Sequence, residues 1–113
     1  MERDQLITLL KKNAVFGAAP ADAIDNLVDV GELRSIEAGT ALIHQGATGE
    51  SIWMLLSGTL EVDENEQIVR TIDTSGEVFG EISAVSLTPA TATVQTADDC
   101  STFCILTENS TES

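Results

Sequence analysis

The sequence predicts a mainly β protein with flanking helices: an antiparallel β jelly-roll barrel or sandwich preceded by two N-terminal helices. Beyond residue 31, apolar stretches of about five residues recur at short intervals, separated by glycine-containing or polar turns. Before residue 31, apolar residues recur instead at the spacing of a helix. Because 113 residues leave room for one core, we expect a single domain over residues 1–113, with a helical lead (1–30), a barrel (31–107) and a short tail (108–113).

Two helices are expected in the lead, over residues 4–12 and 21–30. In each, three apolar side chains fall on one face: Leu6, Leu9 and Leu10 in the first, and Ile24, Leu27 and Val28 in the second. Pro20 suits the first turn of the second helix, and Gly31 suits its end.

Seven short strands are expected after the second helix. Their predicted ranges are 32–37, 40–44, 52–56, 59–62, 68–72, 91–97 and 102–106. Between the strands predicted at 68–72 and 91–97, the pattern after Gly80 changes, because Ile82, Ala84 and Val85 fit one or two helical turns. A short helix there would present unpaired N–H groups at its N-terminus, which favour an anion.

The charge balance limits the partners that this chain can have. Five basic residues face 19 acidic ones, a formal net charge of −14, and no basic residue follows Arg70. Nucleic acid and anionic membranes would be repelled, so we expect no direct binding of either. The longest apolar run, residues 52–56, cannot span a bilayer, and the N-terminus is unlike a signal peptide, so we expect a cytoplasmic protein.

No metal site or disulfide is expected. On one strand, Cys100 and Cys104 would lie roughly 13 Å apart, beyond disulfide reach, so they are expected to be reduced thiols in the core. His44 is the only histidine and is expected to be a satisfied or surface side chain, because a zinc site needs several converging ligands. The acidic residues in the range 63–66 lack the alternation of a calcium loop and predict a solvated hairpin tip.

Three stretches resemble cyclic-nucleotide-binding domains, the family of catabolite activator protein, the regulatory subunits of cyclic-AMP-dependent kinase and nucleotide-gated channels. Residues 39–53 (GTALIHQGATGESIW) and 57–62 (SGTLEV) resemble the family's barrel, and 79–84 (FGEISA) resembles the opening of its phosphate-binding cassette. The resemblance runs from about residue 5 to 106, with six glycines in register. It implies a short helix within the cassette and a site for cyclic AMP or cyclic GMP.

The resemblance also assigns roles within this cassette. Gly80 would let the backbone approach the ligand, and Glu81 would accept a hydrogen bond from the ribose 2′-hydroxyl. The alternative for Glu81 is a helix cap or a solvated carboxylate. The N–H groups around Ile82 and Ser83 would face the phosphate. The complete set of expected ligand-binding residues is Phe79, Gly80, Glu81, Ile82, Ser83, Ala90, Thr91 and Ala92.

One position departs from the family. After a spacer the family has Pro-Arg-(Ala/Thr/Ser)-Ala, and its arginine pairs with the phosphate, whereas residues 89–92 read Pro-Ala-Thr-Ala. Loss of one partner of a desolvated charge pair costs about 2–5 kcal/mol, roughly 30- to several-thousand-fold in affinity. We therefore expect cyclic-nucleotide binding to be weakened or lost. The alternative is a functional sensor that binds through Gly80, Glu81 and backbone N–H groups, aided by Arg34 or Arg70.

The expected function is non-catalytic regulation. Within the sequence there is no Gly-x-Ser-x-Gly motif, no cysteine–histidine pairing evident from spacing and no phosphate loop with a lysine, so we expect no enzyme. Trp53 is expected in the core rather than stacked on a ligand. The expected partners are a cyclic nucleotide, another protein or a second copy. The chain stops seven residues after Leu106, so we expect it to lack the two helices that close over the ligand in the family.

Overall fold

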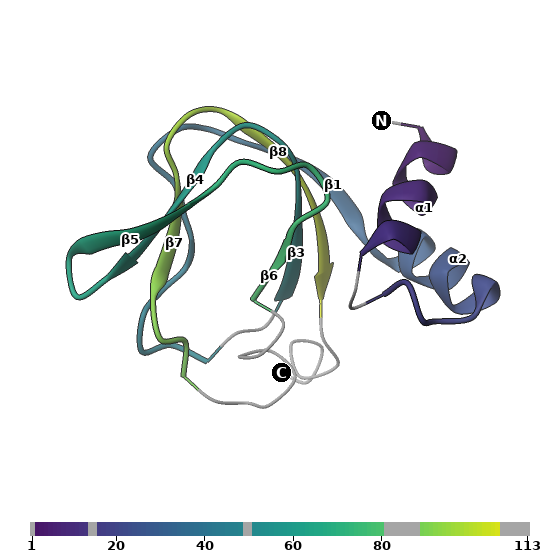
Figure 1. The fold of residues 1–113 in the computed structure, drawn as a ribbon, viewed down its shortest axis with the longest axis horizontal. Helices are drawn as coiled ribbons and strands as arrows, with labels where there is room; N and C mark the ends of the chain where they lie inside the picture. The colour runs from purple at the N-terminus through teal and green to yellow at the C-terminus, as the bar shows by residue number, and fades with distance from the viewer. Residues whose placement is uncertain (1, 14–15, 49–50, 81–88, 107–113) are drawn as a thin grey trace.

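The computed structural model describes residues 2–13, 16–48, 51–80 and 89–106 (Figure 1). Its two helices are α1 (Arg3–Lys12) and α2 (Ala21–Val30). Its strands are β1 (Glu32–Ile36), β2 (Ala41–Ile43), β3 (Ser51–Ser57), β4 (Leu60–Glu64), β5 (Gln67–Ile72), β6 (Val78–Phe79), β7 (Thr93–Thr96) and β8 (Cys100–Leu106). No helix in these ranges is long and apolar enough to cross a membrane.

The strands form two four-stranded antiparallel sheets. The first sheet has the order β1-β8-β3-β6, and the second sheet has the order β2-β7-β4-β5. Figure 1 shows the helices packed beside the first sheet and the β4–β5 hairpin projecting from the opposite side. The predicted β-sandwich with two N-terminal helices is therefore confirmed.

Most of the strand ranges differ slightly from the prediction. Strands β3 and β8 are longer than expected, β2 and β7 are shorter, and β4 is shifted toward the chain's C-terminus. Strand β6 was not predicted, because a strand this short is defined only by its pairing with Trp53 and Met54 of β3. The short helix expected after Gly80 lies outside the described residues.

Alternating side chains of the first sheet divide the core into two clusters. On β3, Trp53 and Leu55 face the second sheet, whereas Met54 and Leu56 face the helices. The inner cluster is closed from the second sheet by Leu60, Ile72 and Val94. The outer cluster is closed from the helices by Leu6, Leu10 and Ile24. Side chains on both faces of β3 are thus buried between residues 53 and 56, which explains the nearly continuous apolar run of this strand.

The helices are held together by charge as well as by packing. In α1, a capping box joins Glu2 and Gln5, and an ion pair of 2.7 Å joins Arg3 Nη1 to Asp29 Oδ1 of α2. Because these groups are exposed, such a pair is worth at most about 1 kcal/mol. The rest of the stabilisation between the helices comes from their apolar faces.

Candidate functional site

The site begins where β6 ends, at Gly80. Its φ is +85°, and a Cβ built there would lie 2.9 Å from Ile43 Cδ1 and 3.1 Å from the carbonyl oxygen of Ser51. Both the dihedral and the crowding exclude a side chain. The glycine is therefore required by its contacts with β2 and β3, in addition to any role toward a ligand.

The neighbouring Phe79 belongs to the core. Its ring stacks on that of Trp53 at a centroid distance of 6.3 Å and an interplanar angle of 8°, and it is only 6% exposed. Trp53 is buried as predicted and belongs to the inner cluster. Of the expected ligand-binding residues, Phe79 therefore supports the wall behind the site rather than forming its surface.

The C-terminal segment of the predicted cassette, residues 89–92, is bonded to the connection between β2 and β3. The Ala90 N–H donates to the Ala47 carbonyl at 2.8 Å, and the Ala90 carbonyl accepts from the Gly46 N–H at 2.8 Å. An isolated bridge pairs Thr48 with Pro89. Both main-chain polar groups of Ala90 are thus used within the protein.

Two further expected residues continue this segment toward β7. Thr91 is exposed and Ala92 is half-buried. The predicted strand starts at Thr91, but β7 starts at Thr93. The hydrogen bonds of Ala90 go to the turn at residues 46–47, so the two residues before Thr93 do not join the sheet. Expected residues Glu81, Ile82 and Ser83 lie outside the described residues.

The structure brings the two ends of the cassette together through one connection. Gly80 touches Ile43 and Ser51, at the ends of β2 and β3, while Ala90 bonds to the turn at Gly46 and Ala47 between them. This connection was not predicted to be part of the site. Its signal is the glycine at position 46, whose φ of +87° marks the turn.

The two arginines proposed as substitutes each have a carboxylate partner. Arg34 Nη2 lies 3.0 Å from Glu32 Oε2, and Arg70 pairs with Glu77. The guanidinium of Arg34 also lies over the Trp53 ring, with Cζ 5.7 Å from the centroid. The same indole is near Gly80, since Trp53 Cδ1 lies 3.6 Å from the position of a Cβ built there.

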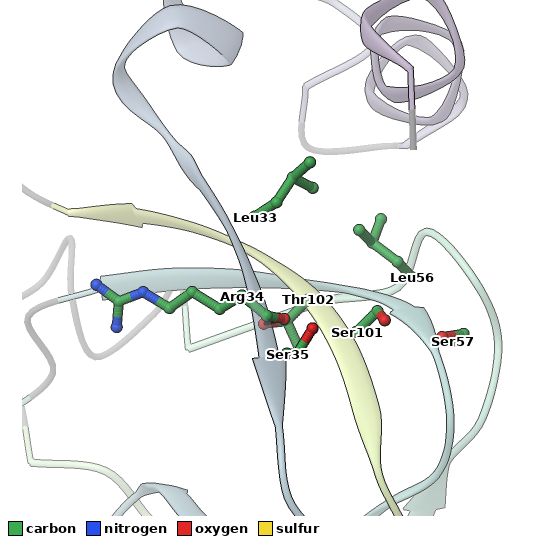
Figure 2. A pocket seen from close by; sticks show the side chains of 7 residues that line it. All are labelled: Leu33, Arg34, Ser35, Leu56, Ser57, Ser101 and Thr102. Atoms are coloured by element: carbon green, nitrogen blue, oxygen red, sulfur yellow. Dashed lines mark hydrogen bonds between the residues drawn. The ribbon is translucent and has the colours of Figure 1, made fainter.

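The register explains how Arg34 reaches Trp53. Arg34 pairs with Thr102, which pairs with Leu55 of the inner cluster, so all three side chains start on the inner face of the first sheet. Figure 2 shows the Arg34 side chain running along the sheet, away from Leu33 and Leu56. Alternation along β1 could have predicted this face from the sequence.

A pocket of about 410 Å³ lies elsewhere, on the first sheet (Figure 2). Its lining residues are Leu33, Arg34, Ser35, Leu56, Ser57, Ser101 and Thr102. None of the expected ligand-binding residues is among them. The pocket is therefore separate from the predicted cassette.

The remaining sequence candidates have structural roles. Both cysteines are free and buried, as predicted. Burial raises the pKa of Cys100, whose Sγ lies 3.3 Å from the Thr59 carbonyl oxygen, so the thiol stays protonated and unreactive. His44 is exposed, and no group of metal-ligating side chains occurs among the described residues. The acidic residues at 63–66 form the tip of the β4–β5 hairpin, as expected.

Comparisons with known proteins agree with this fold. A family model described as the cyclic nucleotide-binding domain matches residues 33–110. A cAMP-dependent protein kinase type II regulatory subunit from Drosophila melanogaster is 27% identical over 94 residues, which cover 83% of this chain and 25% of that protein. The chain spans a quarter or less of the length of the curated relatives it matches.

Solved structures give the same result for the fold. The regulatory domain of Toxoplasma gondii PKA, crystallised with cAMP, superposes with a TM-score of 0.85 at 23% identity, covering 94% of this chain and 43% of that one. The regulatory subunit of a cAMP-independent protein kinase A from Trypanosoma cruzi, bound to guanosine, gives a TM-score of 0.84 at 20% identity, covering 94% of this chain and 39% of that one.

Proposed function

Because this chain belongs to the cyclic nucleotide-binding domain family, we propose that it is a non-catalytic regulatory domain in which cyclic-nucleotide binding is weakened or lost. The ligand site lies between Gly80 and the segment from Ala90 to Ala92. The kinase regulatory subunits that share its fold make regulation the natural role.

The observation that carries this proposal is the environment of Ala90. Its methyl group offers no charge, and its N–H already donates to the Ala47 carbonyl at 2.8 Å. A phosphate placed there would be desolvated without a cation, at a cost of about 2–5 kcal/mol relative to a paired one. Glu81 adds a second negative charge to the same cassette.

A ligand without a phosphate avoids this penalty. The solved structure of the Trypanosoma cruzi neighbour is bound to guanosine, a nucleoside that carries no phosphate. A nucleoside needs hydrogen-bond partners for its ribose and base, which Glu81 and Thr91 could supply, but it needs no arginine. Guanosine is therefore a suitable uncharged probe for the proposed ligand site.

A second candidate function rests on Arg34. Its guanidinium lies against the same Trp53 ring that borders Gly80, and its bond to Glu32 is exposed and therefore weak. If Arg34 leaves Glu32 for a bound phosphate, the domain is a functional sensor of cyclic AMP or cyclic GMP. Arg70 is less suited, because its partner Glu77 is three-quarters buried.

Titration calorimetry with cyclic AMP, cyclic GMP and guanosine tests both candidates. We expect no saturable binding of either cyclic nucleotide at micromolar concentration, and a gain of at least 30-fold in affinity for Ala90→Arg. Guanosine should bind Ala90→Arg and the unmodified chain equally.

Saturation by a cyclic nucleotide at micromolar concentration would contradict the proposal. In that case Arg34→Gln distinguishes the second candidate, since it should remove the binding, while the matched control Arg70→Gln should leave it unchanged. If Ala90→Arg does not raise the affinity for a cyclic nucleotide, the proposed ligand site lacks more than a positive charge.

A further inference from the structure

Strand β5 forms one outer edge of the second sheet. It ends the order β2-β7-β4-β5, and in the described part of the chain no strand pairs with its far side. Figure 1 shows the β4–β5 hairpin projecting from the body of the sandwich. The outward N–H and C=O groups of β5 are therefore open to pair with an added strand.

Two apolar side chains on this edge face solvent. Ile68 is 56% exposed and Val69 is 57% exposed, whereas Ile72 at the other end of the strand is buried. Val69 is the extra residue of a β-bulge, because Val62 pairs with Arg70 and Asp63 pairs with Ile68. Neither side chain takes part in either core cluster.

The edge is held in place by the connection between β2 and β3. Gln45 Nε2 donates to Asn65 Oδ1 at 2.9 Å, and the Asn65 N–H donates to Gln45 Oε1 at 2.9 Å. These two hydrogen bonds fix the turn that joins β4 to β5. A fixed edge loses little conformational freedom when a partner strand binds.

The hairpin is strongly acidic. Carboxylates at Glu61, Asp63, Glu64 and Glu66 lie on or beside it, and the one arginine of β5, Arg70, is paired with Glu77. A second copy would bring the same carboxylates to this edge, against a net charge of −14 on each chain. Like charges across paired strands are unfavourable, so self-association is disfavoured.

We propose that the β5 edge, residues 67–72, binds an extended basic segment of a partner protein as an additional strand. The backbone edge supplies the hydrogen bonds, Ile68 and Val69 supply apolar contact, and the hairpin carboxylates select lysine or arginine side chains. The residues of this surface are distinct from those of the proposed ligand site between Gly80 and Ala90.

The test uses a synthetic peptide, Lys-Val-Lys-Val-Lys-Val, titrated into the isotopically labelled full chain. The largest amide shift changes in the NMR spectrum should fall on residues 67–72. A Glu-Val-Glu-Val-Glu-Val peptide should bind at least tenfold more weakly, and the affinity for the lysine peptide should fall as salt is added.

Variants separate the edge from charge attraction in general. The double variant Ile68→Lys and Val69→Lys should lower the affinity for the lysine peptide at least tenfold. The control Val30→Lys should change this affinity less than twofold, because Val30 lies on α2 and is 67% exposed. Since a β5 variant could unfold the hairpin, Glu64→Lys beside the turn provides a second measurement. It should also lower the affinity for the lysine peptide.

Three outcomes would overturn the proposal. They are shift changes centred outside residues 67–72, equal binding of both peptides, and equal loss in the Val30 control. A concentration-dependent dimer that shifts the β5 amides without peptide would assign the edge to a second copy instead.

Discussion

Strands β8 and β5 differ as much as two strands of one domain can. In β8, side chains on both faces are buried, and Phe103 and Cys104 are 1% exposed. In β5, every residue before Ile72 is exposed. The difference indicates that β8, between β1 and β3, supports the fold, whereas β5 is free to carry a binding function.

The sharpest test of this comparison is Phe103→Ala. Phe103 lies at the centre of the outer cluster, so its truncation should lower the free energy of unfolding by about 3–5 kcal/mol. Chemical denaturation monitored by circular dichroism measures it. Phe16→Ala is the control: Phe16 packs only partly buried against the same cluster and should cost clearly less. Equal losses would show that β8 has no special weight.

A smaller effect is expected where α2 meets β8. A Cβ on Gly31 would lie 2.1 Å from Phe103 Cζ, so Gly31→Ala should destabilise by about 1–3 kcal/mol through overpacking. Adding Phe103→Leu should recover part of this loss, because the ring is the obstacle. Thermal or chemical unfolding of the two single variants and the double variant gives the coupling. Simple additivity would argue against the clash.

At the β4–β5 turn the expected change is a gain. Glu66 has φ +68°, a conformation that suits glycine, so Glu66→Gly should stabilise by about 0.5–1 kcal/mol. Asn65, with φ +55°, should lose stability when changed to alanine, both through strain and through loss of the bonds to Gln45. Urea unfolding of both variants measures these two changes in the free energy of unfolding. A loss for Glu66→Gly would contradict this explanation.

The smallest effect is expected on β5 itself. Ile68→Thr keeps a β-branched side chain and removes an exposed apolar one, so its unfolding free energy should change by less than about 0.5 kcal/mol. A loss above about 1.5 kcal/mol would mean that Ile68 is buried in the folded protein in solution, and the contrast with β8 would fail.

The elements that the sequence predicts well are those with a local pattern. The range of α2 agrees with the prediction, and α1 differs by a single residue at its start. Trp53 was predicted in the core because it stands in the apolar run 52–56, and it is buried there. By contrast, β6 and the late start of β7 depend on pairing with residues far away in the chain, so no local pattern could reveal them.

The same reasoning applies to the candidate site. The sequence identified Gly80 and Ala90 as the ends of one cassette, and the structure adds the reason they are held there: contacts with β2, β3 and the turn at Gly46. The bond from Gly46 to Ala90 joins residues more than forty positions apart. Composition and periodicity carry no information on such a contact.

Gln45 and Gly46 connect the β5 edge to the proposed ligand site. The side chain of Gln45 holds the hairpin turn at Asn65, and the next residue holds the carbonyl of Ala90. Because the two contacts come from adjacent residues, the amides of Gly46, Asn65 and Ala90 should exchange with deuterium as one cooperative unit. Occupation of the proposed ligand site between Gly80 and Ala90 would then be transmitted to the hairpin as a change in that shared opening rate.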